Sequence, residues 1–278
     1  MPFEVLSMGR EKGAKKRTLM MVYTHCEQTG NLRFNNALVK RLTGEELSNQ
    51  FDTTKIDTSA MLPDELKERD LFIVHLGKGW HQFVRGIEHG YHALEPVSTD
   101  DVHDWDYVPG ILDKTDDSEA GVLSMAFNQQ ILQHFLYGNR IVQLFINVPR
   151  RTRGKDTNSF DYLIGDQTIT VSQLQIEMDF IVEKNGEIAL AEAKCAAGAL
   201  PRDFAVVQVY LPFKRLLKML GPKLEAKKIR SMFFIQYTRP DGKDCIRVYE
   251  YTFADPQSMS SLRFVRNAEY VLNKEQKR

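Results

Sequence analysis

The sequence has few cysteines, no long apolar run and no excess of charge of either sign. Three cysteines in 278 residues form a sparse, odd set, which excludes a disulfide framework and favours a reducing compartment such as the cytoplasm. No apolar run approaches the ~20 residues that cross a bilayer, and residues 1–17 lack the apolar stretch of a secretory signal. Lys and Arg number 37, as do Asp and Glu, so the total charge does not indicate a strongly basic nucleic-acid binder. We therefore expect a cytoplasmic globular protein that does not span a membrane.

The charge is nevertheless distributed in blocks. Residues 100–119 are strongly acidic and contain Pro109 and Gly110, a composition typical of a linker or a surface loop. We therefore predict a domain boundary near residue 110, between an N-terminal region at 1–110 and a second domain at 111–278. The alternative is a solvated loop within one domain. Basic blocks lie at 11–17, 149–155 and 214–230.

The spacing of apolar residues predicts both helices and strands. In the first half of the chain it predicts strands at 19–25 and 71–76 and a helix at 31–42. In the second half, Asn185-Gly186 is a strong hairpin signal, and Gly138 is expected to end a helix. That half is predicted to contain helices at 119–137 and 203–220, with strands at 140–148, within 167–184, and at 187–194, 231–239 and 246–253. This order predicts an α/β or α+β core with a mixed sheet.

One predicted hairpin carries polar residues suited to chemistry. Asp179 heads an apolar strand, and the next strand ends in Glu192 and Lys194. Glu192 and Lys194 project to the same face because strand side chains alternate, and the hairpin brings Asp179 beside them. Converging carboxylates bind a hard divalent cation such as Mg²⁺, and a neighbouring lysine stabilises charge or helps to activate water. This set of groups suits phosphodiester hydrolysis.

The tripeptide Glu-x-Lys is not specific by itself, because it occurs four times in the chain. Only the copy at 192–194 ends an apolar strand whose hairpin partner begins with an aspartate. The alternative interpretation is an exposed strand end with an ion pair between Glu192 and Lys194.

The pattern of Asp179, a hairpin, Glu192-x-Lys194 and a following helix resembles the PD-(D/E)XK nuclease superfamily, which includes many type II restriction endonucleases. The resemblance covers about residues 119–253. It implies a restriction-endonuclease-like core, a central mixed sheet flanked by helices, in which Asp179 and Glu192 hold Mg²⁺ and Lys194 assists the attack of water. One departure is that Met178, not proline, precedes the aspartate.

Further acidic and polar candidates surround this motif. Members of the superfamily often carry an acidic residue on the helix before the sheet, and Glu119 is our candidate; the alternative is a carboxylate that stabilises the helix N-terminus. Glu177 is either an additional metal ligand or an edge charge. For Gln208 and Tyr210, on the helix after Lys194, we expect packing roles because their spacing differs from that of relatives in which such residues face the site.

Two segments are candidates for contact with DNA. The first is a basic loop that would hold phosphates, and the second is a glycine-rich segment near Trp80 whose polar side chains would read base edges. Each has the alternative of a solvated surface loop. The candidate residues are Arg150, Arg151, Arg153 and Lys155 in the first segment, and Lys78, His81, Gln82 and Arg85 in the second.

The leading hypothesis is a Mg²⁺-dependent endonuclease acting on double-stranded DNA, of the type II restriction kind, as part of restriction-modification. Residues 1–110 would then help with DNA recognition, and a palindromic target would favour a homodimer. The alternatives are a structure-specific repair or junction-resolving nuclease, and a non-catalytic DNA-binding module with a nuclease-like fold.

Overall fold

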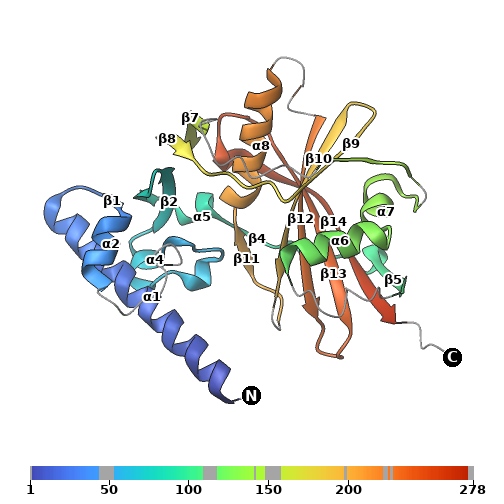
Figure 1. Ribbon diagram of the computed structural model, residues 1–278, viewed down its shortest axis with the longest axis horizontal. Helices are drawn as coiled ribbons and strands as arrows, with labels where there is room; N and C mark the ends of the chain where they lie inside the picture. The colour runs from blue at the N-terminus through green and yellow to red at the C-terminus, as the bar shows by residue number, and fades with distance from the viewer. Residues whose placement is uncertain are drawn as a thin grey trace.

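The structure is a computed structural model of the chain with a mixed α+β fold. It describes residues 2–43, 53–108, 118–140, 142–147, 158–196, 199–221, 225 and 228–274. Figure 1 shows a large twisted sheet with helices on both sides, next to a smaller N-terminal region. No helix in the described ranges is long and apolar enough to cross a membrane.

The largest sheet in the described part of the chain has seven strands in the order β5-β14-β13-β12-β10-β9-β6. Two neighbouring pairs, β10·β12 and β14·β5, are parallel, and the other pairs are antiparallel. The sheet is therefore mixed, as the sequence predicts. Its strands are β5 (Val102–Tyr107), β6 (Phe145–Asn147), β9 (Phe180–Lys184), β10 (Glu187–Cys195), β12 (Ile229–Thr238), β13 (Asp244–Phe253) and β14 (Leu262–Lys274).

Both faces of this sheet are covered. Successive residues of β12 point to opposite faces, so Phe234 lies in one apolar core and Phe233 and Ile235 in another. The first core is closed by helices α6 (Glu119–Asn128) and α7 (Ile131–Tyr137), and the second by α8 (Val207–Leu220). A strand buried on both faces reads as a continuous apolar run, which explains the composition of β12.

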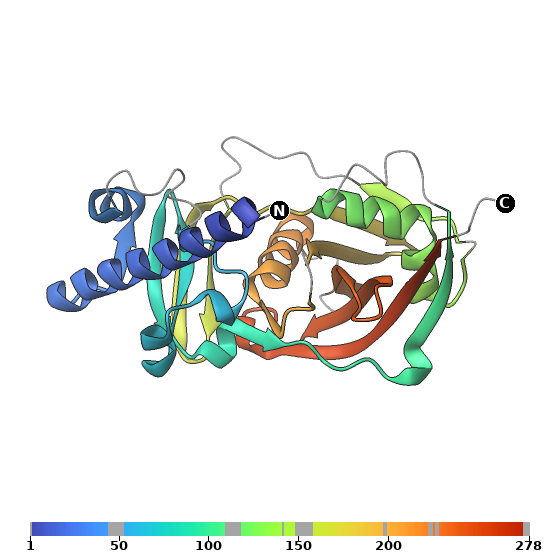
Figure 2. The same ribbon diagram turned by 90° about the horizontal axis from the view of Figure 1, so that it is seen from below.

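The N-terminal region is built around a three-stranded sheet in the order β1-β3-β2. The 28-residue helix α1 lies along it, as Figure 2 shows from a second direction. Its elements are α1 (Pro2–Thr29), β1 (Arg33–Asn35), α2 (Asn36–Thr43), η1 (Ser59–Met61), α4 (Asp64–Glu68), β2 (Leu71–Gly77), β3 (Trp80–Arg85), α5 (Ile87–Gly90), β4 (Tyr91–Ala93) and η2 (Thr99–Asp101). Strand β4 pairs with β11 (Asp203–Ala205), just before α8.

One apolar core joins this region to the second half of the chain. A hairpin of β7 (Asn158–Ile164) and β8 (Gln167–Leu174) packs on β2, and residues of all three strands share one cluster. The contact is close at Gly77, where a Cβ atom would collide with the backbone oxygen of Ser172. We conclude that the N-terminal sheet rests directly on the β7–β8 hairpin.

Several sequence predictions are confirmed. The structure contains the predicted strands at 71–76, 187–194, 231–239 and 246–253, with small differences at their ends. Ser118 is the N-cap of α6, its Oγ accepting from the Gly121 N–H at 3.0 Å, and Gly138 ends α7 in a left-handed conformation. The predicted helix at 203–220 begins four residues late, after β11, and contains Pro212.

Other predictions are wrong. Residues 19–25 are not a strand but part of α1, in which Leu19, Val22, Tyr23 and Cys26 are buried at helical spacing. The helix predicted at 31–42 is β1 followed by α2, and the one at 119–137 is broken between α6 and α7. The strand predicted at 140–148 is reduced to the three residues of β6.

Two strands of the large sheet were missed by the sequence analysis. Strand β14 closes the described chain, and β5 lies inside the acidic stretch interpreted as a linker. In β5 the buried Trp105 and Tyr107 alternate with exposed aspartates, a period of two that the charge of the segment concealed. Because β5 precedes residue 110 and pairs with β14, the large sheet includes a strand from the predicted N-terminal region. Residue 110 itself lies outside the described residues.

Candidate metal centre

The β9–β10 hairpin places the predicted motif at the open end of two paired strands. Its turn, Asn185-Gly186, has positive φ angles of 53° and 79°, as a two-residue type I′ turn requires. The register pairs Phe180 with Ala191. The next positions outward are Asp179 on one strand and Glu192 on the other, so the turn fixes these two carboxyl groups next to each other.

A third carboxylate joins them from α6. Oxygen atoms of Glu119, Asp179 and Glu192 all lie within 4.8 Å of one another. Glu119 is the first residue of α6, a helix that packs along β10, so the capped N-terminus delivers its side chain to the strand ends. Glu119 therefore begins a helix and also lies in the acidic cluster, and its role at the site stays a prediction.

Lys194 lies between two of these carboxylates. Its Nζ is 2.5 Å from Glu119 Oε1 and 3.0 Å from Glu192 Oε1, and its side chain is only 17% exposed. Burial opposes the charge on Lys194, but the adjacent Glu192 and Glu119 carboxylates outweigh it and hold its pKa above the usual range. Lys194 is therefore a fixed ammonium at neutral pH.

The cluster contains three carboxyl groups and one ammonium group. Burial raises the pKa of Glu192 to about 8, and Asp179 adds to this rise, while Lys194 only partly offsets it. Asp179 Oδ2 is buried and has no hydrogen-bond partner among the described residues. If all three carboxylates were ionised, the cluster and its ammonium would sum to a formal charge of −2, so a bound cation would favour loss of the proton from Glu192. Such a set fits a hard divalent cation with oxygen ligands.

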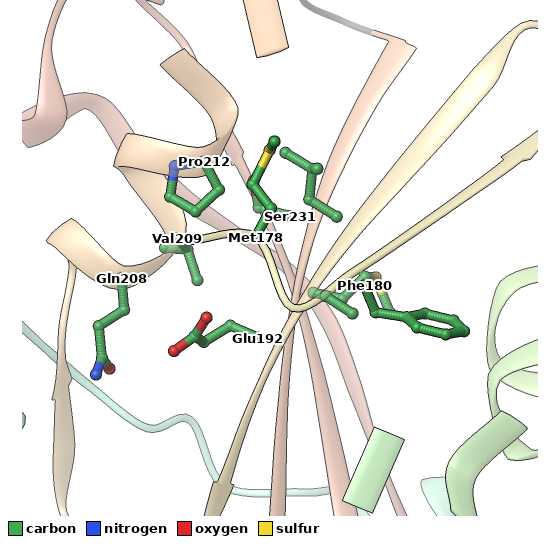
Figure 3. Close-up of a pocket in the computed structure, with 10 residues that line it drawn as sticks. Met178, Phe180, Glu192, Gln208, Val209, Pro212 and Ser231 are labelled. Carbon is green, nitrogen blue, oxygen red and sulfur yellow. The ribbon is translucent and has the colours of Figure 1, made fainter. Parts of the chain in front are cut away.

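A small pocket opens beside Glu192 and reaches α8. Figure 3 shows the Glu192 carboxylate pointing toward the side of the pocket where the Gln208 amide lies, with Met178, Val209 and Pro212 above it. Gln208 donates from Nε2 to Asp57 Oδ1 at 2.9 Å, and its own Oε1 is buried without a partner in the described structure. The amide is thus held at the pocket wall by a residue of the N-terminal region.

Packing roles were expected for both Gln208 and Tyr210, and the structure shows such a role for Tyr210 alone. Tyr210 has the packing role predicted for it, since its side chain is buried and its hydroxyl donates to Pro256 O at 3.2 Å. Gln208 instead lines the pocket that contains Glu192. Asp57 was not identified from the sequence, because it is a single aspartate in a segment without a motif, far along the chain from the hairpin.

Glu177 lies outside the acidic cluster. Its side chain is exposed, and it accepts a hydrogen bond from Gln175 Nε2 at 3.1 Å. The chain between β8 and β9 is not assigned to a strand, and the carboxylates that lie within 4.8 Å of one another are those of Glu119, Asp179 and Glu192. Its position corresponds to the alternative of an edge charge.

The structure describes one of the two groups of candidate DNA-contacting residues. Arg150, Arg151, Arg153 and Lys155 lie outside the described residues. Lys78 is exposed in the turn between β2 and β3, Arg85 is exposed at the end of β3, and Gln82 is half-buried within β3. His81 is 1% exposed, and its Nε2 is 2.7 Å from Asn36 Oδ1. Contrary to the prediction, His81 is a core residue and does not present its ring to a DNA groove.

Two family models match adjacent parts of the sequence. Residues 18–83 match a family described as a domain of unknown function (DUF6996), and residues 86–271 match one described as a domain of unknown function (DUF6997). No curated protein and no solved structure matches the chain. The three residues of the acidic cluster and Lys194 all fall within the second match, which covers more than half of the sequence. The chain belongs to the DUF6997 family.

Proposed function

We propose that this protein is a Mg²⁺-dependent nuclease that hydrolyses phosphodiester bonds in double-stranded DNA. The observation that carries the proposal is the convergence of Glu119, Asp179 and Glu192 on one point, with Lys194 held among them. The order of these groups along the chain, from a helix through a hairpin to a second helix, is that of the PD-(D/E)XK superfamily noted above.

In this proposal Asp179 and Glu192 hold the metal, with Glu119 as a third oxygen donor. Bound Mg²⁺ supplies positive charge to the scissile phosphate and lowers the pKa of water. The buried Asp179 Oδ2 without a partner fits this role, because an unsatisfied buried carboxylate oxygen is costly unless a ligand completes it.

The role of Lys194 follows from its charge. Its raised pKa excludes it as a general base at neutral pH, since the side chain has no free lone pair. It acts instead as a cationic donor that orients the attacking water and stabilises the negative charge that develops on the phosphate. The half-buried Gln208 donates from Nε2 to Asp57, which leaves its Oε1 as an unpaired hydrogen-bond acceptor at the pocket wall.

The finer proposal is a type II restriction endonuclease with a restriction-endonuclease-like core. Digestion of plasmid DNA with Mg²⁺, and with EDTA as control, tests it directly. Discrete fragments support a sequence-specific enzyme, whereas cleavage confined to branched DNA favours a repair or junction-resolving nuclease. Absence of metal-dependent cleavage on either substrate would overturn the proposal in favour of a non-catalytic module.

Variants of the same protein tie the activity to the cluster. We expect Asp179→Asn and Glu192→Gln each to lower the cleavage rate by about a thousandfold or more, because metal stabilisation of the transition state amounts to several kcal/mol. Glu183→Gln is the matched control, because Glu183 lies on the same hairpin with an exposed side chain. A cluster variant that cleaves as fast as this control would remove that residue from the site.

A further inference from the structure

Asp57 connects the N-terminal region to the pocket that contains Glu192. Its Oδ1 accepts a hydrogen bond from Gln208 Nε2 at 2.9 Å, and Gln208 lines that pocket from the start of α8. The two residues are 151 positions apart in the chain and fall in different family matches. This hydrogen bond therefore joins the two matched parts of the sequence at the wall of the candidate site.

The backbone around Asp57 is fixed by strand β11, which leads directly into α8. The Ala205 N–H donates to Asp57 O at 2.9 Å. Two residues further along the segment, Ser59 donates to the Asp203 carboxylate from both its backbone N–H, at 2.9 Å, and its hydroxyl group. The Asp57 carboxylate is thus held in place beside the first turn of α8.

The carboxylate of Asp57 determines which end of the Gln208 amide faces the pocket. An ionised carboxylate only accepts hydrogen bonds, so the NH₂ group of the amide must be the end that faces Asp57. The reversed amide would place Oε1 against Asp57 Oδ1, two acceptors without a hydrogen between them. Gln208 Oε1 is therefore the free end, and it is buried with no hydrogen-bond partner among the described residues. An acceptor in this state requires a donor that the described protein groups do not supply.

The pocket that Gln208 and Glu192 share suits a water molecule as this donor. Its polar lining groups are Glu192, Gln208 and Ser231, and the rest of its wall is apolar. Figure 3 shows the Glu192 carboxylate pointing toward the side where the Gln208 amide lies. The pocket has room for about one water molecule, and buried waters bind to polar groups that otherwise lack partners.

Without Asp57, the amide would have a reason to reverse. Its buried NH₂ group would lose its acceptor, and an unsatisfied buried donor is costly. Glu192 is the carboxyl group that lines the same pocket. The NH₂ group would therefore turn toward Glu192, and Oε1 would turn away from it.

We infer that Asp57 is a positioning residue of the candidate metal centre. It holds the Gln208 amide with Oε1 toward Glu192, so that Oε1 accepts a hydrogen bond from water at the acidic cluster. Lys194 can only donate to water, whereas Oε1 only accepts from it, so the two groups supply complementary hydrogen bonds. This inference rests on the proposed nuclease function and deepens it, because it gives the N-terminal region a part in holding the water.

Exchange of the two interacting groups tests this role through the rate of DNA cleavage with Mg²⁺. Gln208→Glu alone places two carboxylates against each other, and we expect the single-turnover rate to fall by about tenfold, a coupling typical of residues in one hydrogen-bond network. Addition of Asp57→Asn lets the new amide donate to the new carboxylate and leaves an acceptor oxygen toward the pocket. The rate of this double variant should therefore return to within about threefold of the wild type.

Asp203→Asn is the matched control for the contact between the two regions. Asp203 binds the same segment through Ser59, and no hydrogen bond joins it to Gln208 in the described structure. The asparagine retains an acceptor for the Ser59 N–H, so this variant should cleave at the wild-type rate. Thermal unfolding of each variant verifies that the fold is intact.

Nuclear magnetic resonance of the side-chain amides in EDTA gives a readout that needs neither metal nor cleavage. The Gln208 NH₂ signals are identified by their loss in Gln208→Glu. In Asp57→Ala they should move, because the hydrogen bond to the carboxylate is lost, whereas in Asp203→Asn they should stay at the wild-type position.

The possible results separate the role of Asp57 from the nuclease proposal. Gln208 signals that do not move in Asp57→Ala, or a double variant no faster than Gln208→Glu, would overturn the positioning role even if the wild type cleaves DNA. Wild-type protein that cleaves no DNA, with Gln208 signals that move as expected, would reject the nuclease and support the orientation of the amide by Asp57.

Discussion

Lys194 supplies the positive charge next to the acidic cluster. It is the one ammonium placed among three carboxylates in the described cluster, and two of those carboxylates contact it directly. A buried charge that loses its partner is strongly destabilising, whereas the complete pair is close to neutral. The same residue thus serves stability without metal and charge stabilisation during the proposed reaction.

We predict that Lys194→Met abolishes DNA cleavage and leaves metal binding intact. Without metal, and at a pH above 8 where Glu192 is ionised in the wild type, the variant should be less stable than the wild type by about 3–5 kcal/mol, because Glu192 loses its counter-charge. Calorimetric titration with Mn²⁺ and thermal unfolding in EDTA measure the two effects. A loss of Mn²⁺ affinity as large as in Glu192→Gln would show that Lys194 organises the ligands and does not act on water or phosphate.

His81 leads to a prediction that concerns pH and is independent of the metal. Burial lowers its pKa to about 3, and the neighbouring His75 adds to this effect. The unfolded chain therefore binds a proton near pH 6.5, where the folded protein does not. The stability contributed by neutral His81 is fully present above about pH 6.5 and is lost as the pH falls toward 3.

Between pH 6.5 and 4.5, His81 should lower the free energy of unfolding by about 1.4 kcal/mol for each pH unit. His75, whose pKa is also lowered by burial, should act in the same direction. We expect His81→Gln to remove the contribution of one histidine, about 1.4 kcal/mol for each pH unit, from the pH dependence of the free energy of unfolding. Urea unfolding across this pH range measures it. An unchanged dependence in the variant would mean that the ring is protonated in the folded protein.

At the scale of elements, the break between α6 and α7 depends on backbone conformation. Gln130 adopts a left-handed φ of 62° directly before α7, and its side chain is exposed. Gly138 adopts a similar φ of 65° at the other end of the same helix, with open space around it. Both ends of α7 therefore require a left-handed backbone conformation, but only Gly138 is the residue type that adopts it without strain.

We predict opposite effects of two substitutions at these ends. Gln130→Gly should stabilise the protein by about 0.5–1 kcal/mol by relieving a strained conformation, and Gly138→Ala should destabilise it by about 1 kcal/mol. In a protein of this size, a change of 1 kcal/mol in stability shifts Tm by roughly 2–4 °C. Scanning calorimetry compares the two. Changes of the same sign would show that the strain at Gln130 is offset by contacts elsewhere.

At the scale of the whole molecule, the N-terminal region is part of the large core. Residues of β2, such as Ile73 and Val74, share a cluster with Ile169 of β8 and Phe233 of β12. Asp57 also holds Gln208 at the pocket that contains Glu192. The two family matches therefore correspond to parts of the sequence that pack against each other and contribute to one site.

We predict that a fragment containing residues 86–278 does not fold cooperatively. Removal of β2 and α1 exposes many buried apolar side chains, each contributing about 1.5–3 kcal/mol, and their sum exceeds the 5–15 kcal/mol by which a typical domain is stable. Urea unfolding followed by circular dichroism compares the fragment with the full chain. A cooperative transition in the fragment would show that it is an independent domain.

The sequence by itself determined the hairpin and the position of its acidic residues. Asn185-Gly186 fixes a two-residue turn, and the apolar strands on either side set the register that places Asp179 next to Glu192. These are local relations, so they follow from spacing alone. The same locality explains why the interiors of β2, β10, β12 and β13 were predicted correctly.

Only the tertiary structure decided the remaining features. It showed that Leu19 to Cys26 face a core as a helix, which a short apolar run cannot distinguish from a strand. It paired the acidic β5 with β14, and it held Gln208 with Asp57 from a distant segment. It brought Glu119 to the hairpin and placed His81 in the interior. Each of these depends on contacts between residues far apart in the chain, and the spacing of neighbouring residues does not specify such contacts.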